Sequence, residues 1–323
     1  MTISAEQAAW FATTFDQLVG NVEVAVRGKD RPVRLALTCL LSEGHLLLED
    51  NPGTGKTQLA RALANTVQGS HSRIQFTPDL LPSDVTGVTI YDQQRQTFEF
   101  KSGPIFATIV LADEINRASP KTQSALLEVM EEGRVTVDGV PHSVGRPFMV
   151  IATQNPIEQA GTYRLPEAQL DRFLLKLVLD LPERDNEVEV LTRHAAGFNP
   201  RDLAAAGVKP VLDAKQLAAA QAAVAKVGAS ADVLAYAVDL ARATRQSPSV
   251  KLGVSPRGST ALLAAAKAWA WLNGFDAITP DHVQAMVLPV MRHRIQLRPE
   301  AELEGVSADT ILRAILQQVQ VPI

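Results

Sequence analysis

The chain has 323 residues, 46% of them hydrophobic and 20% charged, which is the composition of a globular protein with room for two domains. Its net charge of −4 at pH 7 gives no general attraction to nucleic acids or anionic membranes. Cys39 is the only cysteine, so no disulfide can form within the chain, and a reducing, cytoplasmic location is expected. Neither a membrane-spanning segment nor a targeting signal is expected from the sequence.

The first elements expected along the chain are two helices, over residues 5–18 and 31–41, because their apolar side chains recur at helical spacing. Gly28 lies between them, and a glycine there allows the backbone to approach a flat ligand such as a nucleotide base. An apolar strand over residues 46–48 follows and runs into a glycine-rich segment that ends in Gly-Lys-Thr. This order of elements predicts a site for phosphate groups.

The glycine-rich segment predicts a phosphate-binding loop at the start of a helix that extends to about residue 67. Its two glycines let backbone N–H groups turn inward, its lysine would contact the β- and γ-phosphates, and its threonine hydroxyl would bind Mg²⁺. Asp50 stands where the strict pattern has its first glycine, and an ordinary strand-turn-helix corner is the alternative interpretation. The expected nucleotide-binding residues of the loop are Gly53, Thr54, Gly55, Lys56 and Thr57.

Two acids form the second chemical signal, after a strand at 73–77 and a hairpin over 87–101. They are Asp113 and Glu114, which end an apolar strand over 108–114, and ligands gather at the ends of parallel strands. Asp113 would hold Mg²⁺, largely through water, and Glu114 would orient or deprotonate the water that attacks the γ-phosphate. A solvated strand end is the alternative, and the preceding phosphate loop argues against it.

Two further polar candidates lie in the last part of this region. Asn155 is at the polar tip of an apolar strand, where it can bind the attacking water or the γ-phosphate, although a strand-capping role before Pro156 is equally plausible. Arg172 lies near the end of a short helix and is the last candidate before the final strand. The elements expected here are a helix over 119–132, a hairpin over 133–144, a strand over 148–156, a short helix over 165–173 and a strand over 174–178.

Pro182 marks a boundary, after which helical spacing and alanine dominate. The expected fold class is therefore α/β, with a parallel sheet, helices and two hairpins over residues 1–181 and an all-helical lid domain over 182–323. Arg257 opens one lid helix and could fold onto the nucleotide, while a solvated surface charge is the alternative. The six histidines show no metal-ligand spacing, so no metal other than Mg²⁺ is expected. The expected lid helices cover residues 183–195, 213–227, 231–245, 257–272 and 280–287.

Together these motifs resemble the AAA+ ATPases: residues 52–57 as Walker A, 109–114 as Walker B, Asn155 as sensor 1 and Arg257 as sensor 2. Within that superfamily the sequence is most similar to the MoxR family. The segments that resemble its signature are 113–118, 120–128, 152–156 and 165–173.

The resemblance implies an αβα core with a helical lid, ATP and Mg²⁺ as cofactors, and assembly into a ring, commonly a hexamer. It implies a chaperone-like role, in which ATP hydrolysis remodels a protein client together with a partner that has a von Willebrand factor A domain. Arg172 would be the arginine finger that reaches the γ-phosphate held by the neighbouring subunit. Arg117 would lie at the same interface or form a structural salt bridge.

Other functions compatible with a phosphate loop are less well supported. A small-molecule kinase needs no Asp-Glu strand tip, and a GTPase would need an Asn-Lys-x-Asp sequence, which is absent. A DNA-acting motor could use the hairpins, but Arg134, His142 and Arg146 form a thin basic set, so nucleic acid is an unlikely partner. A scaffold that binds nucleotide without turnover would not need both Lys56 and Glu114.

Overall fold

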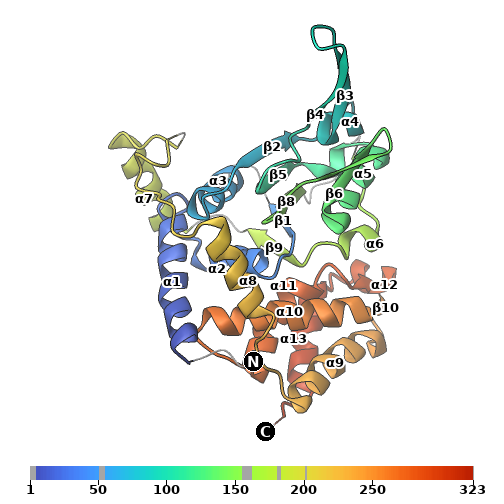
Figure 1. Cartoon of the computed structure of the whole chain (residues 1–323). Helices are drawn as coiled ribbons and strands as arrows, with labels where there is room; N and C mark the ends of the chain where they lie inside the picture. Colours follow the sequence, from blue (N-terminus) through green and yellow to red (C-terminus); the bar gives the residue numbers. More distant parts are fainter. Residues whose placement is uncertain (1–4, 51–54, 155–161, 180–182, 201, 323) are drawn as a thin grey trace.

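The central element of the fold is a sheet of five parallel strands in the order β2-β5-β8-β1-β9 (Figure 1). The computed structural model describes residues 5–50, 55–154, 162–179, 183–200 and 202–322. The strands of the sheet are β1 (Leu46–Asp50), β2 (His71–Gln75), β5 (Ile109–Asp113), β8 (Met149–Gln154) and β9 (Leu175–Leu179). The α/β fold class expected from the alternation of helices and strands is confirmed.

The inner strands are apolar because both faces of the sheet are covered. Every residue of β5 is buried, as are the first five residues of β8. Successive side chains of a strand point to opposite faces, and β1 shows the result. Leu46 and Leu48 belong to one hydrophobic cluster, whereas Leu47 belongs to the other. Near-continuous apolar runs are what such doubly covered strands require.

Different sets of helices cover the two faces of the sheet. One face packs into a cluster that contains α1 (Ala5–Glu23), α2 (Asp30–Leu41), α3 (Lys56–Thr66) and much of the lid. The opposite face is covered by α4 (Pro82–Thr86), the 3₁₀-helix η1 (Ile115–Arg117), α5 (Pro120–Glu132) and α6 (Glu167–Leu170). The two ends of α5 follow from the sequence, because the Ser119 side chain caps its first turn and Gly133 ends it with a positive φ.

The two hairpins expected from the sequence are confirmed. They are formed by β3 (Gly87–Asp92) with β4 (Thr97–Ser102) and by β6 (Arg134–Val137) with β7 (Val140–Ser143). The first hairpin is the long arm at the top of Figure 1. The second turns at Asp138 and Gly139, both with positive φ, as two-residue hairpin turns require.

The second part of the chain is mainly helical, and none of the described helices combines the length with the apolar character needed to cross a membrane. The helical lid expected from the sequence is confirmed, with one addition that the sequence did not predict: β10 (Val250–Leu252) pairs antiparallel with β11 (Gln296–Leu297). Strands of three and two residues are too short to show an alternating pattern. The helices are α7 (Arg184–Ala195), α8 (Ala214–Val224), α9 (Ala231–Gln246), α10 (Pro256–Leu272), α11 (Pro280–Met291), α12 (Pro299–Leu303) and α13 (Ala308–Gln318).

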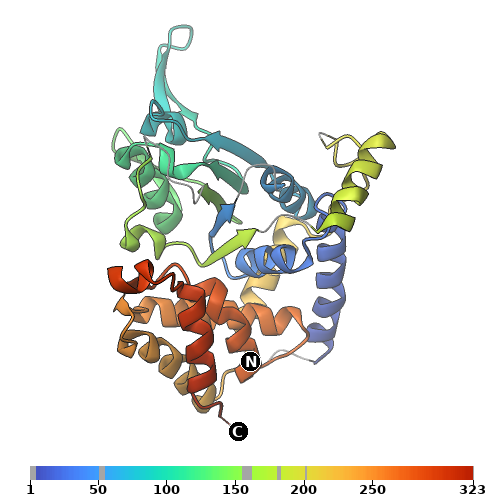
Figure 2. The ribbon, with the colours of Figure 1, turned by 180° about the vertical axis from the view of Figure 1, so that it is seen from behind.

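Helix α7 lies apart from the other lid helices, beside the connection between α1 and α2 (Figures 1 and 2). Arg193 donates a hydrogen bond from Nη1 to the Val24 carbonyl oxygen at 2.7 Å. Arg27 and Glu189 form an ion pair across the same contact, with 3.3 Å between Nε and Oε1. Thus α7 packs against the core domain on the side of Gly28. The domain boundary at residue 182 stays a prediction.

His45 is a buried histidine that joins β8 to α5. Its Nδ1 accepts a hydrogen bond from the Val150 N–H group at 3.0 Å, so the proton is assigned to Nε2, which donates to the Met130 carbonyl oxygen at 3.0 Å. Burial lowers the pKa of His45 from 6.5 to about 4. The folded protein therefore keeps this ring neutral at pH values where the unfolded chain binds a proton.

This difference predicts acid destabilisation between pH 6.5 and about pH 4. The free energy of unfolding should fall as the pH falls through this interval, by about 3 kcal/mol from His45, because only the unfolded state gains the proton. His45→Gln keeps a donor and an acceptor but does not titrate, so its stability should change less with pH. Urea unfolding of both proteins at several pH values measures the difference. Parallel pH profiles would contradict the role assigned to His45.

Candidate functional site

The structure describes residues 55–57 of the predicted phosphate loop. They lie between β1 and α3, at the end of the sheet where the parallel strands have their carboxyl termini, which is called the carboxyl edge here. Gly55 is the N-cap of α3 and has a φ of +93°, which a glycine adopts without steric cost. Lys56 and Thr57 are the first two residues of the helix, where backbone N–H groups lack partners within the helix and favour an anion. Gly53 and Thr54 lie outside the described residues.

Asp113 ends β5 at the same edge of the sheet and is only 7% exposed. Its Oδ1 accepts a hydrogen bond from the Thr153 hydroxyl at 2.6 Å, and its Oδ2 accepts one from Arg73 Nη2 at 2.6 Å. The two partners come from β8 and β2, the strands on either side of β5. Because both carboxylate oxygens have protein partners, this arrangement suits contact with a metal ion through water.

Glu114 follows directly and has a φ of +57°, an uncommon conformation for a residue with a side chain. Its N–H group donates to Thr153 Oγ1 at 2.9 Å, and its Oε2 lies 2.8 Å from Nε of Arg117. Such backbone conformations occur often at functional sites. The sequence suggested either an interface position or a structural salt bridge for Arg117, and the structure shows a salt bridge.

Arg73 and Thr153 were not expected from the sequence. Once the strand order is known, the register explains both. Gln75 pairs with Asp113, so Arg73, two residues earlier on β2, lies on the same face within reach of the carboxylate. On the other side, Ala112 pairs with Ala152, which places Thr153 beside Asp113. These contacts depend on strand order, which local patterns do not show.

Polar side chains continue along the carboxyl edge beyond β5. Gln154, the last residue of β8, donates from Nε2 to Glu49 Oε2 at 2.9 Å. Lys176 Nζ lies 2.6 Å from the same oxygen atom of Glu49. Asn155 is the next residue after β8 and lies outside the described residues. The carboxyl edge beside the start of α3 is therefore polar, whereas the interiors of the inner strands β5 and β8 are buried.

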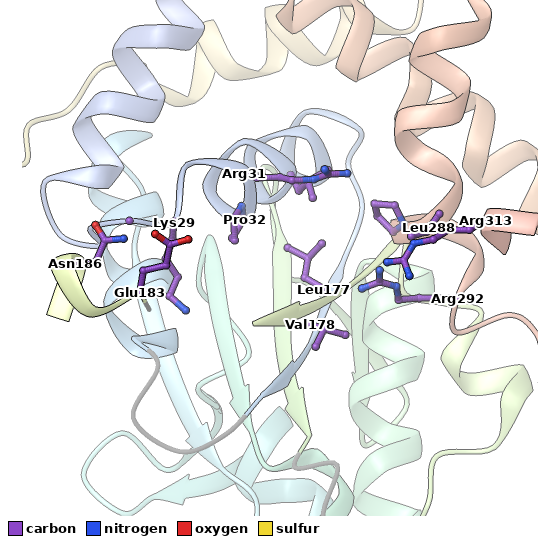
Figure 3. Close-up of a pocket in the computed structure, with 13 residues that line it drawn as sticks. Lys29, Arg31, Pro32, Leu177, Val178, Glu183, Asn186, Leu288, Arg292 and Arg313 are labelled. Carbon is purple, nitrogen blue, oxygen red and sulfur yellow. The ribbon is translucent and has the colours of Figure 1, made fainter. Parts of the chain in front are cut away.

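Two pockets flank the segment that connects α1 to α2. The first, of about 510 Å³, extends from Gly28 and Lys29 to the lid (Figure 3). In Figure 3, the side chains of Arg31, Arg292 and Arg313 lie on the lid side of this pocket. The second, of about 450 Å³, lies between this segment, α7 and the start of α3. Both volumes are in the range of small-molecule sites.

Gly28 itself has a φ of +69°, and a Cβ atom built on it would lie 2.5 Å from the Cγ atom of Asn186. The group that lies against this glycine is an α7 side chain that lines the larger pocket, and the expected approach of a nucleotide base stays a prediction. A bulkier residue would displace α7 or strain the backbone.

Arg172 and Arg257 lie together, away from the phosphate loop. Arg172 Nη2 is 3.0 Å from Glu131 Oε2, and Arg257 Nη1 is 3.4 Å from Glu131 Oε1. Arg257 Nε is also 3.9 Å from Asp171 Oδ2. The structure therefore brings the two arginines from the core and the lid to one shared carboxylate at the end of α5.

The strand register shows that Arg172 lies at the opposite edge of the sheet from its own phosphate loop. β9 begins three residues after Arg172 and runs parallel to β1, with Leu175 opposite Leu46. Arg172 thus lies near the amino end of β1, whereas the phosphate loop follows the carboxyl end at Asp50. Four residue steps separate these ends by roughly 13 Å. An arginine side chain is too short to span this distance.

The fold and the carboxyl edge together define an AAA+ ATPase with a helical lid. A sequence profile described as "ATPase family associated with various cellular activities (AAA)" matches residues 45–175, and one described as "AAA lid domain" matches residues 242–315. A crystal structure of a protein from Cytophaga hutchinsonii superposes with a TM-score of 0.90 at 36% identity and covers 98% of each chain.

Curated relatives identify the family within this class. Chaperone MoxR1 of Mycobacterium tuberculosis is 39% identical over 327 residues, which cover 98% of this chain and 85% of the relative. YeaC of Bacillus subtilis is 49% identical over 306 residues, which cover 95% of this chain and 92% of the relative. The chain belongs to the MoxR family of AAA+ ATPases.

The donor set at the carboxyl edge fits Mg²⁺ that arrives with a nucleotide. Among the described residues, no group of three or more His, Cys, Asp and Glu side chains is arranged to hold a metal ion. Mg²⁺ is usually bound by one or two protein oxygens, by water and by substrate phosphates. The Thr57 hydroxyl and the Asp113 carboxylate are donors of this type.

Removal of the Thr153 hydroxyl should destabilise the carboxyl edge. Thr153 is 1% exposed, and Thr153→Val would leave Asp113 Oδ1 and the Glu114 N–H group each without one hydrogen bond. The expected loss is roughly 1–3 kcal/mol in the free energy of unfolding. Thr153→Ser keeps the hydroxyl and should lose less. Chemical denaturation measures both variants, and equal losses would show that the methyl group matters more than the hydrogen bonds.

Proposed function

We propose that this protein hydrolyses ATP at the carboxyl edge of its sheet. The observation that supports the proposal is the arrangement of the N-terminus of α3 and the end of β5 at one edge, with Lys56 and Thr57 on the first and Asp113 and Glu114 on the second. In the proposal, Lys56 binds the β- and γ-phosphates, and the backbone N–H groups of the loop surround them. The loop residues proposed to bind nucleotide are Gly53, Thr54, Gly55, Lys56 and Thr57.

Each acid has its own role in the proposed reaction. When bound with the nucleotide, Mg²⁺ would supply positive charge opposite the charge that develops on the phosphates. Thr57 and Asp113 hold this ion, the latter largely through water. Glu114 orients the attacking water and accepts its proton, and Asn155 binds the same water or the γ-phosphate. Gly28 is proposed to lie beside the base, next to the two pockets that flank its segment.

The position of Arg172 supports a shared active site. Since this arginine lies too far from its own phosphate loop, it can contact a γ-phosphate only in a neighbouring subunit. A ring closed by heterologous contacts, such as a hexamer, places one face of each subunit against a different face of the next. We propose that Arg172 acts in this way, and that Arg257 acts from the same side because both bind Glu131.

The proposed work of the ring is chaperone-like remodelling of a protein client in the cytoplasm, together with a partner that has a von Willebrand factor A domain. The name of the relative Chaperone MoxR1 supports the chaperone role. Two exposed hairpins provide surface for such contacts. Exposed side chains on the first include Ile90, Tyr91 and Phe98.

The proposal is tested by phosphate release from ATP by the purified protein, with Mg²⁺ and with chelator. Mg²⁺-dependent release is expected, and its absence at all protein concentrations would overturn the assignment. Glu114→Gln, which should bind ATP without hydrolysis, then serves as bait for clients and partners in the presence of ATP, with Lys56→Ala as the non-binding control. Stimulation by single-stranded DNA, with steeply salt-dependent binding, would instead favour a DNA-acting motor.

A further inference from the structure

Arg294 belongs to the lid, between α11 and β11, yet its side chain reaches the core domain and is only 3% exposed. Nε donates to Asp171 Oδ1 at 2.6 Å. Nη2 donates to the carbonyl oxygens of Asp171 at 3.1 Å and of Phe173 at 2.7 Å, and Nη1 donates to that of Leu174 at 3.2 Å. Burial of a charge is tolerated where it is paired and hydrogen-bonded in this way.

The segment that Arg294 binds is the one that contains Arg172. Residues 171–174 connect α6 to β9, and Arg294 binds carbonyl oxygens on both sides of Arg172. These contacts are made to the backbone around Arg172, and the side chain of Arg172 extends to Glu131. A buried lid residue therefore fixes the backbone from which this arginine extends.

The same guanidinium also supports Arg257. The second carboxylate oxygen of Asp171 accepts a hydrogen bond from Ser255 Oγ at 3.5 Å and lies 3.9 Å from Arg257 Nε. Gly258, in the first turn of α10, packs directly on the stem of Arg294, because a Cβ atom there would lie 3.0 Å from Arg294 Cδ. The turn that presents Arg257 thus rests on Arg294 and on its ion-pair partner.

We infer that Arg294 is a positioning residue, which holds Arg172 and Arg257 in the geometry needed at the ATP site of the neighbouring subunit. This inference rests on the proposed function, in which Arg172 completes that site. Arg294 is part of the lid, whereas Arg172 is part of the core. A shift of the lid against the core would therefore displace Arg172, so the lid of one subunit would regulate hydrolysis in the next.

Lysine is the informative replacement for Arg294. The planar guanidinium uses all three nitrogens at once, whereas a lysine keeps the charge on a single nitrogen and cannot bind the same acceptors together. Arg294→Lys should lower kcat for ATP roughly tenfold to hundredfold, because the finger is misplaced, and leave KM for ATP unchanged. Arg298→Lys is the matched control, since Arg298 is an exposed lid arginine four residues further on, and it should keep the wild-type kcat.

Mixed rings separate a positioning role from general damage to the lid. In a mixture of Arg294→Lys and Glu114→Gln subunits, the first supplies an intact pocket and the second an intact, correctly held Arg172. About a quarter of randomly formed interfaces are then complete, so activity should rise several-fold above the mean of the two pure proteins. In a mixture of Arg294→Lys and Arg172→Ala, every interface has an impaired arginine, and no rise is expected.

The mixture of Arg172→Ala with Glu114→Gln is the reference for these experiments. If that reference fails to recover although subunits exchange and silent sites are tolerated, the shared active site of the proposed function is wrong. If it recovers and the mixture with Arg294→Lys does not, or if Arg294→Lys alone turns over like wild type, the inference about Arg294 is overturned. Should Arg294→Lys lose its cooperative thermal transition, Asp171→Asn, which weakens the same contact from the core side, replaces it in both mixtures with the same expected outcomes.

Discussion

Glu114→Gln and Arg172→Ala proteins should each be nearly inactive, and their mixture should recover ATP hydrolysis. The first lacks the group that activates water, and the second lacks the cation that stabilises charge in the transition state, a contribution of roughly 10³-fold or more for arginine fingers. Where an Arg172→Ala subunit supplies the pocket and a Glu114→Gln neighbour supplies Arg172, the interface is complete. Random mixing of equal amounts makes roughly one quarter of the interfaces complete.

Subunit exchange must be measured in the same mixture, for example by energy transfer between labelled subunits. Recovery places Arg172 in trans, in agreement with its distance from its own phosphate loop. A mixture that exchanges freely and stays inactive contradicts the finger role, unless rings with a silent site are inactive as a whole. A mixture of Glu114→Gln with wild type decides this point, because a proportional loss of activity shows that silent sites are tolerated.

Lys56→Ala and Glu114→Gln should separate nucleotide binding from hydrolysis. Lys56→Ala removes charged contacts to the phosphates and should weaken ATP binding by roughly two orders of magnitude or more. Glu114→Gln removes only the carboxylate that activates water, so it should bind ATP as wild type does while kcat falls roughly 10²- to 10⁴-fold. Titration with a fluorescent ATP analogue and measurement of phosphate release provide the two quantities.

The control for this pair is Lys121→Ala, since Lys121 is an exposed lysine on α5, and it should change neither quantity. Loss of affinity in Glu114→Gln equal to that in Lys56→Ala would contradict the separate roles. It would indicate instead that Glu114 supports the loop structurally, for example through its salt bridge with Arg117.

The sequence predicted the sheet, its flanking helices and both hairpins because these features are local. Apolar runs such as residues 109–112 are long enough to identify buried strands, and Asp138-Gly139 has the residues that a tight hairpin turn requires. The motifs also placed the two acids at the end of β5. These acids could be placed because the end of an apolar strand can be recognised within a single segment of sequence.

The contacts between distant segments could not be predicted in the same way. The hydrogen bond of Arg73 to Asp113 depends on which strands are neighbours, and strand order is not a property of either strand alone. The shared carboxylate of Glu131 and the buried contact of Arg294 with Asp171 depend on how the lid lies against the core. The short strands β10 and β11 exist because lid packing brings them together.

Attempts to divide this protein into separately produced parts meet an obstacle in its hydrophobic core. Helix α10 packs against α1 and α2, and residues as far apart as Leu37 and Trp271 belong to one buried cluster. A fragment that ends before the lid would expose a broad apolar face on the N-terminal helices and should aggregate. Chimaeras that exchange lids between relatives should therefore transfer α1 and α2 together with the lid, so that the apolar surfaces of these helices and of α10 remain complementary.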